Sequence, residues 1–340
     1  MNVTALICEL NPLHRGHEYI IGRAREQSDV TVLVMSGNFT ERGVPAAFDK
    51  YARAEAAVRS GADLVVELPY PWCSAGVEGF ARGGVSIVSA IGADRLVFGS
   101  ESGDFALIEK AARIKASCEF ADAAKTAEEN DRGAGSAEIF DRVMRAFGVN
   151  DPLGANDKLG AEYVRFGRDA GISNFTSVKR IETRSASEIR SEMPEAITIE
   201  NRYNGILFDY CRINGAKSSD ELVRYAAGVA HECVSATEFI MNLPTKKYTL
   251  ARIRRTILAD MLGVREDPTG EPDFTVLLAA NERGREYLAE IKKNAAIEIV
   301  TKPADAVSRG FAAETRADEL YCLCAGLRGG EMMRRKPYIE

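Results

Sequence analysis

Histidine is scarce in this sequence, and the long apolar runs that a membrane helix needs are missing. The 340 residues include three histidines, and no segment approaches the roughly eighteen consecutive apolar residues of a membrane-spanning helix. The seven cysteines are odd in number and none forms a C-x-x-C pair, so we expect reduced thiols and assign no metal ligands. No basic stretch precedes the first apolar run, and we therefore expect a cytoplasmic protein without membrane contact.

Net positive charge is also missing. The formal net charge is −6 at pH 7, so the protein as a whole would repel nucleic acid. Any contact with RNA must come from a local basic patch.

Short β-branched segments alternate with helical patterns through the first half of the chain. The alternation predicts an α/β fold with a doubly wound parallel sheet, in which all strands end at one edge. Ligands bind at that edge, so the residues directly after each strand are candidate site residues. Strands are predicted at 3–8, 30–35, 63–68, 95–98 and 175–181.

The length predicts two units, because a typical domain has about 100–200 residues. We expect a nucleotide-binding domain at 1–198, with a polar helical insertion near 102–171. Residues 199–340 are expected to form a smaller mixed α+β C-terminal domain, with strands at 274–278 and 296–301.

Two of the three histidines, His14 and His17, lie directly after the first predicted strand, in the motif Asn11-Pro12-Leu13-His14-Arg15-Gly16-His17. A helix that begins near Arg15 places His17 in its first turn, where free N–H groups and the helix dipole attract an anion. Gly16 would let a phosphate approach the backbone closely. Two imidazoles could then neutralise charge on a phosphate chain during attack on the α-phosphorus. Alternatively, the histidines cap the helix and pack in a polar loop.

The motif resembles the H-x-G-H signature of the nucleotidyltransferase superfamily, which implies a Rossmann-like core. The segment SASEIR at 185–190 resembles the late I-S-x-T-x-I-R element that covers the phosphates from the other side. More narrowly, MSGNFTERGVPAAFDKYARAEAAVRSGADLVVELP, FARGGVSIV, FGSESGD and TKKYTLARIRR resemble the bacterial tRNA(Met) cytidine acetate ligase family. That resemblance implies activation of acetate with ATP, accompanied by Mg²⁺, to acetyl-adenylate and pyrophosphate. Acetylation of the wobble cytidine in elongator tRNA(Met) would follow.

The same resemblance implies an ATP site in which His14 and His17 are catalytic. Its first stretch would comprise Ile7, Cys8, Glu9, Leu10, Asn11, Pro12, Leu13, His14, Arg15, Gly16, His17, Glu18, Tyr19 and Ile20. Gly99, Asn156, Arg180 and Ile181 would complete the adenosine pocket. Ser185, Ser187 and Arg190 would belong to the helix nearest the phosphates.

Polar residues after the next strands have two interpretations each. Ser36 and Gly37 could offer backbone amides, and Arg42 a guanidinium, to acetate or the adenylate, or the segment is a surface turn. Lys50 and Arg53 share a helix face that points into the cleft or into water.

Acidic residues lie at or directly after the ends of two further predicted strands. Glu67 follows its strand at the cleft rim, where a partner arginine is the simpler explanation. Glu101 and Asp104 could position a metal carried by ATP, but for Asp104 we prefer a helix cap.

The local basic patch lies in residues 245–255, where Lys246, Lys247, Arg252 and Arg255 are candidate RNA contacts. An apolar stripe would leave Arg252 and Arg255 on the opposite helix face, free to meet phosphates or simply solvated.

Two alternative functions would use the same histidine site. One is a small-molecule nucleotidyltransferase that transfers AMP to a mononucleotide or carboxylate, and the other is a non-catalytic nucleotide sensor.

Overall fold

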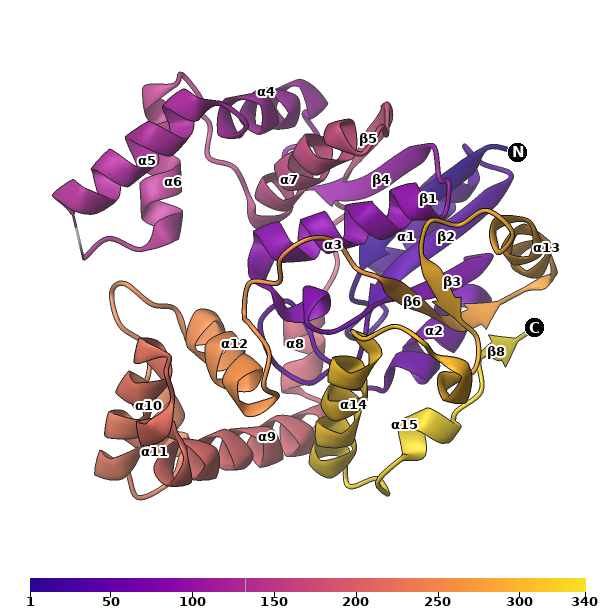
Figure 1. The fold of residues 1–340 in the computed structure, drawn as a ribbon. Coiled ribbons are helices and arrows are strands. Elements are labelled where there is room, and N and C mark those ends of the chain that lie inside the picture. The colour runs from indigo at the N-terminus through magenta and orange to yellow at the C-terminus, as the bar shows by residue number, and fades with distance from the viewer. Residues whose placement is uncertain (132) are drawn as a thin grey trace.

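A mixed β-sheet forms the centre of the protein in the computed structural model, which describes residues 1–131 and 133–340 (Figure 1). The strand order is β5-β4-β1-β2-β3-β6-β7, with β8 paired to β6. All pairs are parallel except β3 with β6. The strands are β1 Val3–Cys8, β2 Val30–Ser36, β3 Leu64–Leu68, β4 Arg95–Ser100, β5 Asn174–Lys179, β6 Phe274–Ala280, β7 Glu298–Val300 and β8 Tyr338–Ile339.

Helices cover both faces of this sheet, and the predicted doubly wound architecture is confirmed. One face carries α1 (Arg15–Arg25) and α2 (Lys50–Arg59), and the other carries α3 (Gly76–Ala90), α7 (Ala155–Asp169) and α13 (Glu282–Ile291). Every residue of β2 and β3 is buried, which is why these strands read as continuous apolar runs and not as alternating patterns.

The predicted helical insertion consists of α4 (Phe105–Lys115), α5 (Cys118–Asn130) and α6 (Ser136–Ala146), followed by α7. Asp104 is the cap that we preferred, because its carboxylate accepts from the Leu107 amide at 3.1 Å. A second helical group, α9 (Pro194–Ile213), α10 (Glu221–Glu232), α11 (Ala236–Asn242) and α12 (Leu250–Met261), lies beside the sheet in Figure 1. In the described part of the chain, no helix combines the length and apolarity needed to cross a membrane.

The C-terminal strands differ from expectation. We expected the strands near 274 and 296 to form part of a separate mixed domain, but β6 pairs antiparallel with β3 and extends the central sheet. The physical reason is that β3 would otherwise present an unpaired apolar edge, and the fully buried β6 covers it. The domain boundary at residue 198 stays a prediction, but the sheet continues across it.

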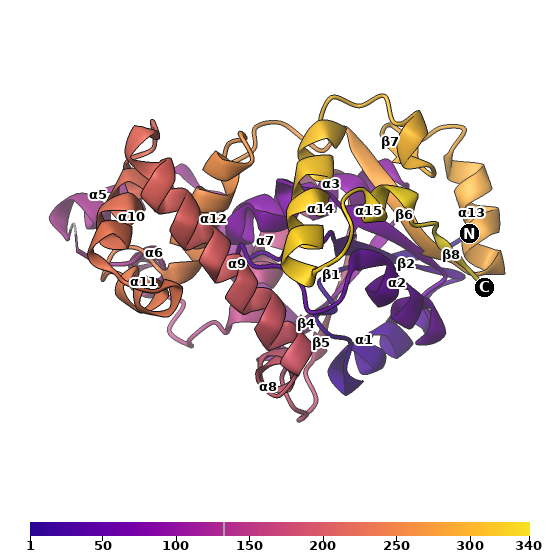
Figure 2. The ribbon, with the colours of Figure 1, turned by 90° about the horizontal axis from the view of Figure 1, so that it is seen from below.

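The last helices return to the strand ends. After β7, the chain forms α14 (Phe311–Ala325) and α15 (Glu331–Arg334) (Figure 2). Side chains of α14 contact Lys50 at the start of α2 and the Tyr70 amide shortly after β3. Three single turns of 3₁₀ helix, at Trp72–Ser74, Gly215–Lys217 and Pro303–Asp305, and the short helix α8 (Ala186–Ser191) complete the secondary structure of the described residues. Residues from both ends of the chain therefore meet at one edge of the sheet.

Candidate active site

The histidine motif forms the turn between β1 and α1. His14 is the N-cap residue of α1, and its Nδ1 atom accepts a hydrogen bond from the Gly16 amide at 3.0 Å. The rings of His14 and His17 lie against each other, with centroids 3.9 Å apart and planes tilted by 32°. The capping alternative is therefore correct for His14, but it does not exclude a phosphate role. With Nδ1 accepting, the proton of a neutral His14 ring sits on Nε2 and can be donated.

Both imidazoles are held in the neutral form. Burial, the neighbouring His14 ring and Arg180 lower the pKa of His17 to about 3. Burial and Arg180 also lower the pKa of His14, against a smaller opposing effect of Glu18. The Nδ1 atom of His17 is buried and has no hydrogen-bond partner among the described residues. The pair therefore offers N–H donors, and not positive charges, to a ligand at the helix N-terminus.

The second predicted half of the nucleotide site lies next to the first. Arg190, on α8, donates to the backbone carbonyl oxygen of Asn11. A side chain at Gly16 would lie 2.8 Å from the His14 ring and 3.3 Å from Thr183, in the segment that leads to α8. Ser185 caps α8 through a reciprocal pair of hydrogen bonds with Glu188. The structure thus brings residues 185–190 against the turn at Asn11, while the phosphate contacts of Ser185, Ser187 and Arg190 stay predictions.

The predicted adenosine residues also converge. A Cβ atom at Gly99 would lie 3.8 Å from Ile20 and 3.9 Å from Arg180. Glu101 accepts from both the backbone and side-chain nitrogens of Asn156, at 3.0 and 2.6 Å. Its Oε1 also lies 3.5 Å from the Arg180 guanidinium. Glu101 therefore caps α7 and links two of the predicted adenosine contacts, and its role in positioning a metal carried by ATP stays a prediction.

The loop after β2 corrects part of the substrate prediction. The Gly37 amide donates to the carbonyl oxygen of Leu68 at 3.1 Å, so it is not free to bind acetate. The Ser36 side chain is fully buried, with its hydroxyl 3.4 Å from the guanidinium of Arg53. Arg42 is exposed. Burial lowers the pKa of Arg190, and the nearby charge of Arg42 adds to that effect. Of the three predicted residues, Arg42 is the one that lies exposed, and its contact with acetate or the adenylate stays a prediction.

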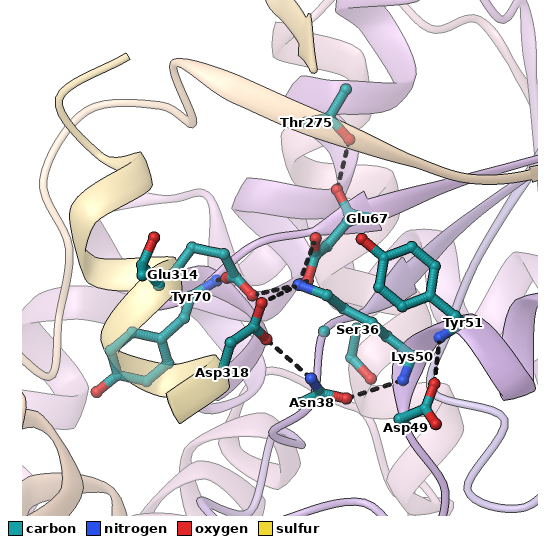
Figure 3. Close-up of polar contacts among 12 residues, drawn as sticks. Ser36, Asn38, Asp49, Lys50, Tyr51, Glu67, Tyr70, Thr275, Glu314 and Asp318 are labelled. Atoms are coloured by element: carbon teal, nitrogen blue, oxygen red, sulfur yellow. Dashed lines mark hydrogen bonds and ion pairs between the residues drawn. The ribbon is translucent and has the colours of Figure 1, made fainter. Parts of the chain in front are cut away.

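Lys50 and Arg53 are both buried, so neither points into water. The Lys50 ammonium lies 2.8 Å from Glu67, 2.8 Å from Glu314 and 2.9 Å from Asp318 (Figure 3). Glu67 is therefore not a residue of the cleft rim, and its partner is a lysine instead of the arginine that we expected. The two acids of α14 were not anticipated, because they lie more than 260 residues from Lys50 in the sequence.

Asn38 and Arg53 connect this cluster to the histidine turn. Asn38 accepts from the Lys50 amide and donates to Asp318, each at 2.8 Å. Arg53 donates to the carbonyl oxygen of Glu9 at 2.5 Å and to that of Gly37. The turns that follow β1 and β2 are therefore held at a fixed separation by one buried guanidinium.

The basic segment near α12 is only partly as predicted. Arg255 is not free to meet phosphates: it pairs with Glu266 at 3.2 Å and with Glu41 at 3.5 Å. Its backbone packs against Gly43, where the φ of +71° and the lack of space disfavour any side chain. Arg255 therefore joins α12 to the loop after β2.

The other basic residues of this segment are exposed. Lys246, Lys247 and Arg252 all lie on the surface. The charged groups of Lys247 and Arg252 lie 5.2 and 5.3 Å from the ring of Tyr248. The carbonyl oxygen of Lys246 lies near Gly135, at the start of α6. These residues form a surface, referred to below as the Tyr248 basic surface, of the kind that contacts nucleic acid.

The remaining predicted ATP residues range from buried to exposed. Ile7 is buried in β1, and Leu10, Asn11 and Pro12 are buried in the turn after it. Cys8, Leu13 and Ile20 are partly buried, and Arg15, Glu18, Tyr19 and Ile181 are exposed. The described residues contain no group of three or more His, Cys, Asp or Glu side chains placed to hold a metal ion.

Comparison with known proteins agrees with this geometry. A family model described as HIGH Nucleotidyl Transferase matches residues 1–205 and 214–332, and the chain therefore belongs to this nucleotidyltransferase family.

Its relatives carry a more specific name. A protein of Pediococcus pentosaceus named tRNA(Met) cytidine acetate ligase is 30% identical over 97% of both chains. A protein of the same name from Acetivibrio thermocellus is 29% identical over 95% of both chains. A crystal structure of Thermotoga maritima TmcAL bound with alpha-thio ATP superposes with a TM-score of 0.87 at 26% identity, covering 100% of this chain and 99% of the other.

Proposed function

We propose that this protein is a tRNA(Met) cytidine acetate ligase, which activates acetate with ATP and transfers the acetyl group to a cytidine of the tRNA. The similarity that supports this extends over nearly the whole length of both chains and includes the helical region and α14, in addition to the nucleotide motif. The observation that carries the chemistry is the His14–His17 pair at the N-terminus of α1.

In the first step, an acetate oxygen attacks the α-phosphorus of ATP and pyrophosphate leaves. The neutral imidazoles would donate N–H hydrogen bonds to the phosphate oxygens as charge develops, assisted by the positive end of the α1 dipole and by Arg190. Arg180 and Asn156 would hold the adenosine. Mg²⁺ would enter with the triphosphate of ATP, because the described residues contain no clustered carboxylates placed to hold it alone.

In the second step, the tRNA must reach the adenylate. The exposed Lys246, Lys247 and Arg252 are proposed phosphate contacts, while Arg255 is withdrawn from that role because its guanidinium is occupied by two carboxylates. A protein of net charge −6 would bind tRNA through such a local surface. The substrate is proposed to be elongator tRNA(Met), which would be met in the cytoplasm.

One assay tests the proposal directly. The protein is incubated with labelled acetate, ATP and total tRNA, and acid-stable label in RNA is measured. His17→Ala should abolish acetate-dependent ATP–pyrophosphate exchange and RNA labelling. The matched control is His231→Ala on the exposed face of α10, the third histidine of the chain, which should leave both intact. If exchange depends on a mononucleotide or another carboxylate and RNA stays unlabelled, the ligase proposal is wrong.

A further inference from the structure

Glu9 occupies a constrained position at the carboxyl end of β1. Its Oε1 atom accepts from the Glu41 amide at 2.7 Å, and its carbonyl oxygen accepts from Arg53 at 2.5 Å. The next residue, Leu10, has a φ of +49°, which non-glycine residues rarely adopt. The chain therefore turns sharply after Glu9, and the acid lies between the histidine turn and the loop after β2.

The charged groups around Glu9 place it beside the predicted phosphate contacts. Burial is the largest effect on its carboxyl group and raises its pKa. The hydrogen bond from the Glu41 amide and the charges of Arg53 and Arg190 oppose this rise, while the charge of the Glu41 carboxylate adds to it. The titratable and charged groups that face it are Cys8, Glu41, Arg53, Tyr163 and Arg190. Arg190 is in turn close to Arg42. Glu9 therefore lies near two arginines that we expect to contact the anionic substrates.

A second observation indicates that this position is built to receive a polar group. The Tyr163 hydroxyl, on α7, is buried and has no hydrogen-bond partner among the described residues. It lies close enough to Cys8, Glu9 and Glu41 for their charges to act on its pKa. Buried polar atoms without partners are rare in native proteins and need an explanation such as a bound ligand or water.

The proposed second half-reaction needs a proton acceptor that the histidines do not supply. The exocyclic amine of cytidine forms a C–N bond with the acetyl carbonyl carbon, the C–O bond to AMP breaks, and one amine proton must leave. With a pKa near 3, His17 is a poor proton acceptor at neutral pH. A carboxylate whose pKa is raised by burial is better matched to this task.

We propose, on the basis of the proposed function, that Glu9 is the general base that takes the amine proton of cytidine during acetyl transfer. Only one carboxylate oxygen accepts from the Glu41 amide, and the residue is half-buried, which leaves the second oxygen for the substrate. The purely structural alternative is that Glu9 only braces the loop after β2.

The substitution Glu9→Gln separates these two roles. A glutamine carbonyl oxygen can still accept from the Glu41 amide, but it cannot take a proton. We expect the single-turnover rate of acetyl transfer to RNA to fall by about 10²-fold or more relative to acetate-dependent ATP–pyrophosphate exchange. Wild-type transfer should rise with pH through the Glu9 titration and then level off, and the variant should lack that rise. Glu9→Asp should restore part of the transfer rate.

The control is Glu26→Gln, the same change in an exposed acid directly after α1, whose carboxylate pairs with Arg23. It should change the ratio of transfer to exchange by less than about threefold, since no proton-transfer role is assigned to it. Equal losses of transfer and exchange in Glu9→Gln, with correct folding by circular dichroism, would overturn the base assignment and favour a purely structural role of Glu9 in supporting the loop after β2. An unchanged ratio would overturn it as well. If the wild type transfers no acetyl group to RNA, the proposed function itself fails, and the two failures are thus distinguishable.

Discussion

Removal of the Lys50 ammonium should destabilise the protein more than any surface substitution. Its three carboxylate partners lie within 3.0 Å, and no side chain in the cluster is more than 6% exposed. Lys50→Met keeps most of the side-chain volume but leaves the acids without their cation. Breaking a buried ion pair by removing one partner costs about 3–5 kcal/mol.

This cost can be converted to a melting temperature. A 340-residue protein has an unfolding entropy of about 0.7 kcal/mol/K, from roughly 2.1 cal/mol/K per residue. The expected loss therefore corresponds to a decrease in Tm of about 4–7 °C. Lys292→Met, at an exposed position after α13, is the matched control and should change stability by no more than about 0.5 kcal/mol.

The deficit should depend on pH in a defined direction. Burial and the neighbouring carboxylates raise the pKa of Asp318 to about 7, and burial also raises the pKa of Glu67. An acid with a raised pKa stabilises the fold at low pH and loses that contribution as pH rises toward the folded-state value. Because Lys50 lowers both pKa values, the variant should be least stable near pH 8 and recover toward the wild type near pH 5. Chemical denaturation at both pH values measures this. A deficit below about 1 kcal/mol at pH 8, or one that grows on acidification, would refute the charge argument.

Three further predictions concern the site and its surroundings. ATP should raise the pKa of His17 from about 3, because phosphate oxygens favour the protonated ring; an NMR titration of the imidazole that shows no change would contradict direct phosphate contact. Gly43→Ala should cost about 1–3 kcal/mol, because its φ is +71° and the added Cβ would lie 2.8 Å from the Arg255 backbone nitrogen. Its control, Gly22→Ala in the open face of α1, should stabilise by about 0.5–1 kcal/mol in the same thermal melt. Lys247→Gln with Arg252→Gln should reduce the salt dependence of tRNA binding by a slope of about two, measured by filter binding between 50 and 200 mM salt; an unchanged slope would place the RNA elsewhere.

Local patterns predicted the elements of the fold well because each strand of the first half is an apolar run between polar turns. The patterns could not predict the partner of β6, since pairing with β3 is decided by which sheet edge stays open and not by any local feature. The same limit explains Glu67. Its position at a strand end was readable, but its contact with Lys50 depends on α14, which supplies Glu314 and Asp318 from the far end of the chain.

The histidine motif was predictable for a different reason. Its cap, its helix start and its two rings lie within a few residues, so the local sequence contains the whole geometry. The geometry of the basic segment, in contrast, is not contained in its local sequence. Arg252 and Arg255 are equivalent by helical spacing, and only the tertiary contacts with Glu41 and Glu266 show that Arg255 is a structural residue.

The contacts at the strand ends explain why the nucleotide motif needs the C-terminal part of the chain. Asp318 and Glu314 on α14 hold Lys50, and Asp318 also holds Asn38, which accepts from the Lys50 amide. One turn further along α2, Arg53 joins the loop after β2 to the carbonyl oxygen of Glu9. A displacement of α14 would leave Lys50 buried without counter-charge and loosen both turns that border the proposed acyl-transfer site. The turn that carries the histidines is therefore positioned in part by residues of α14 that lie about 300 positions away in the sequence.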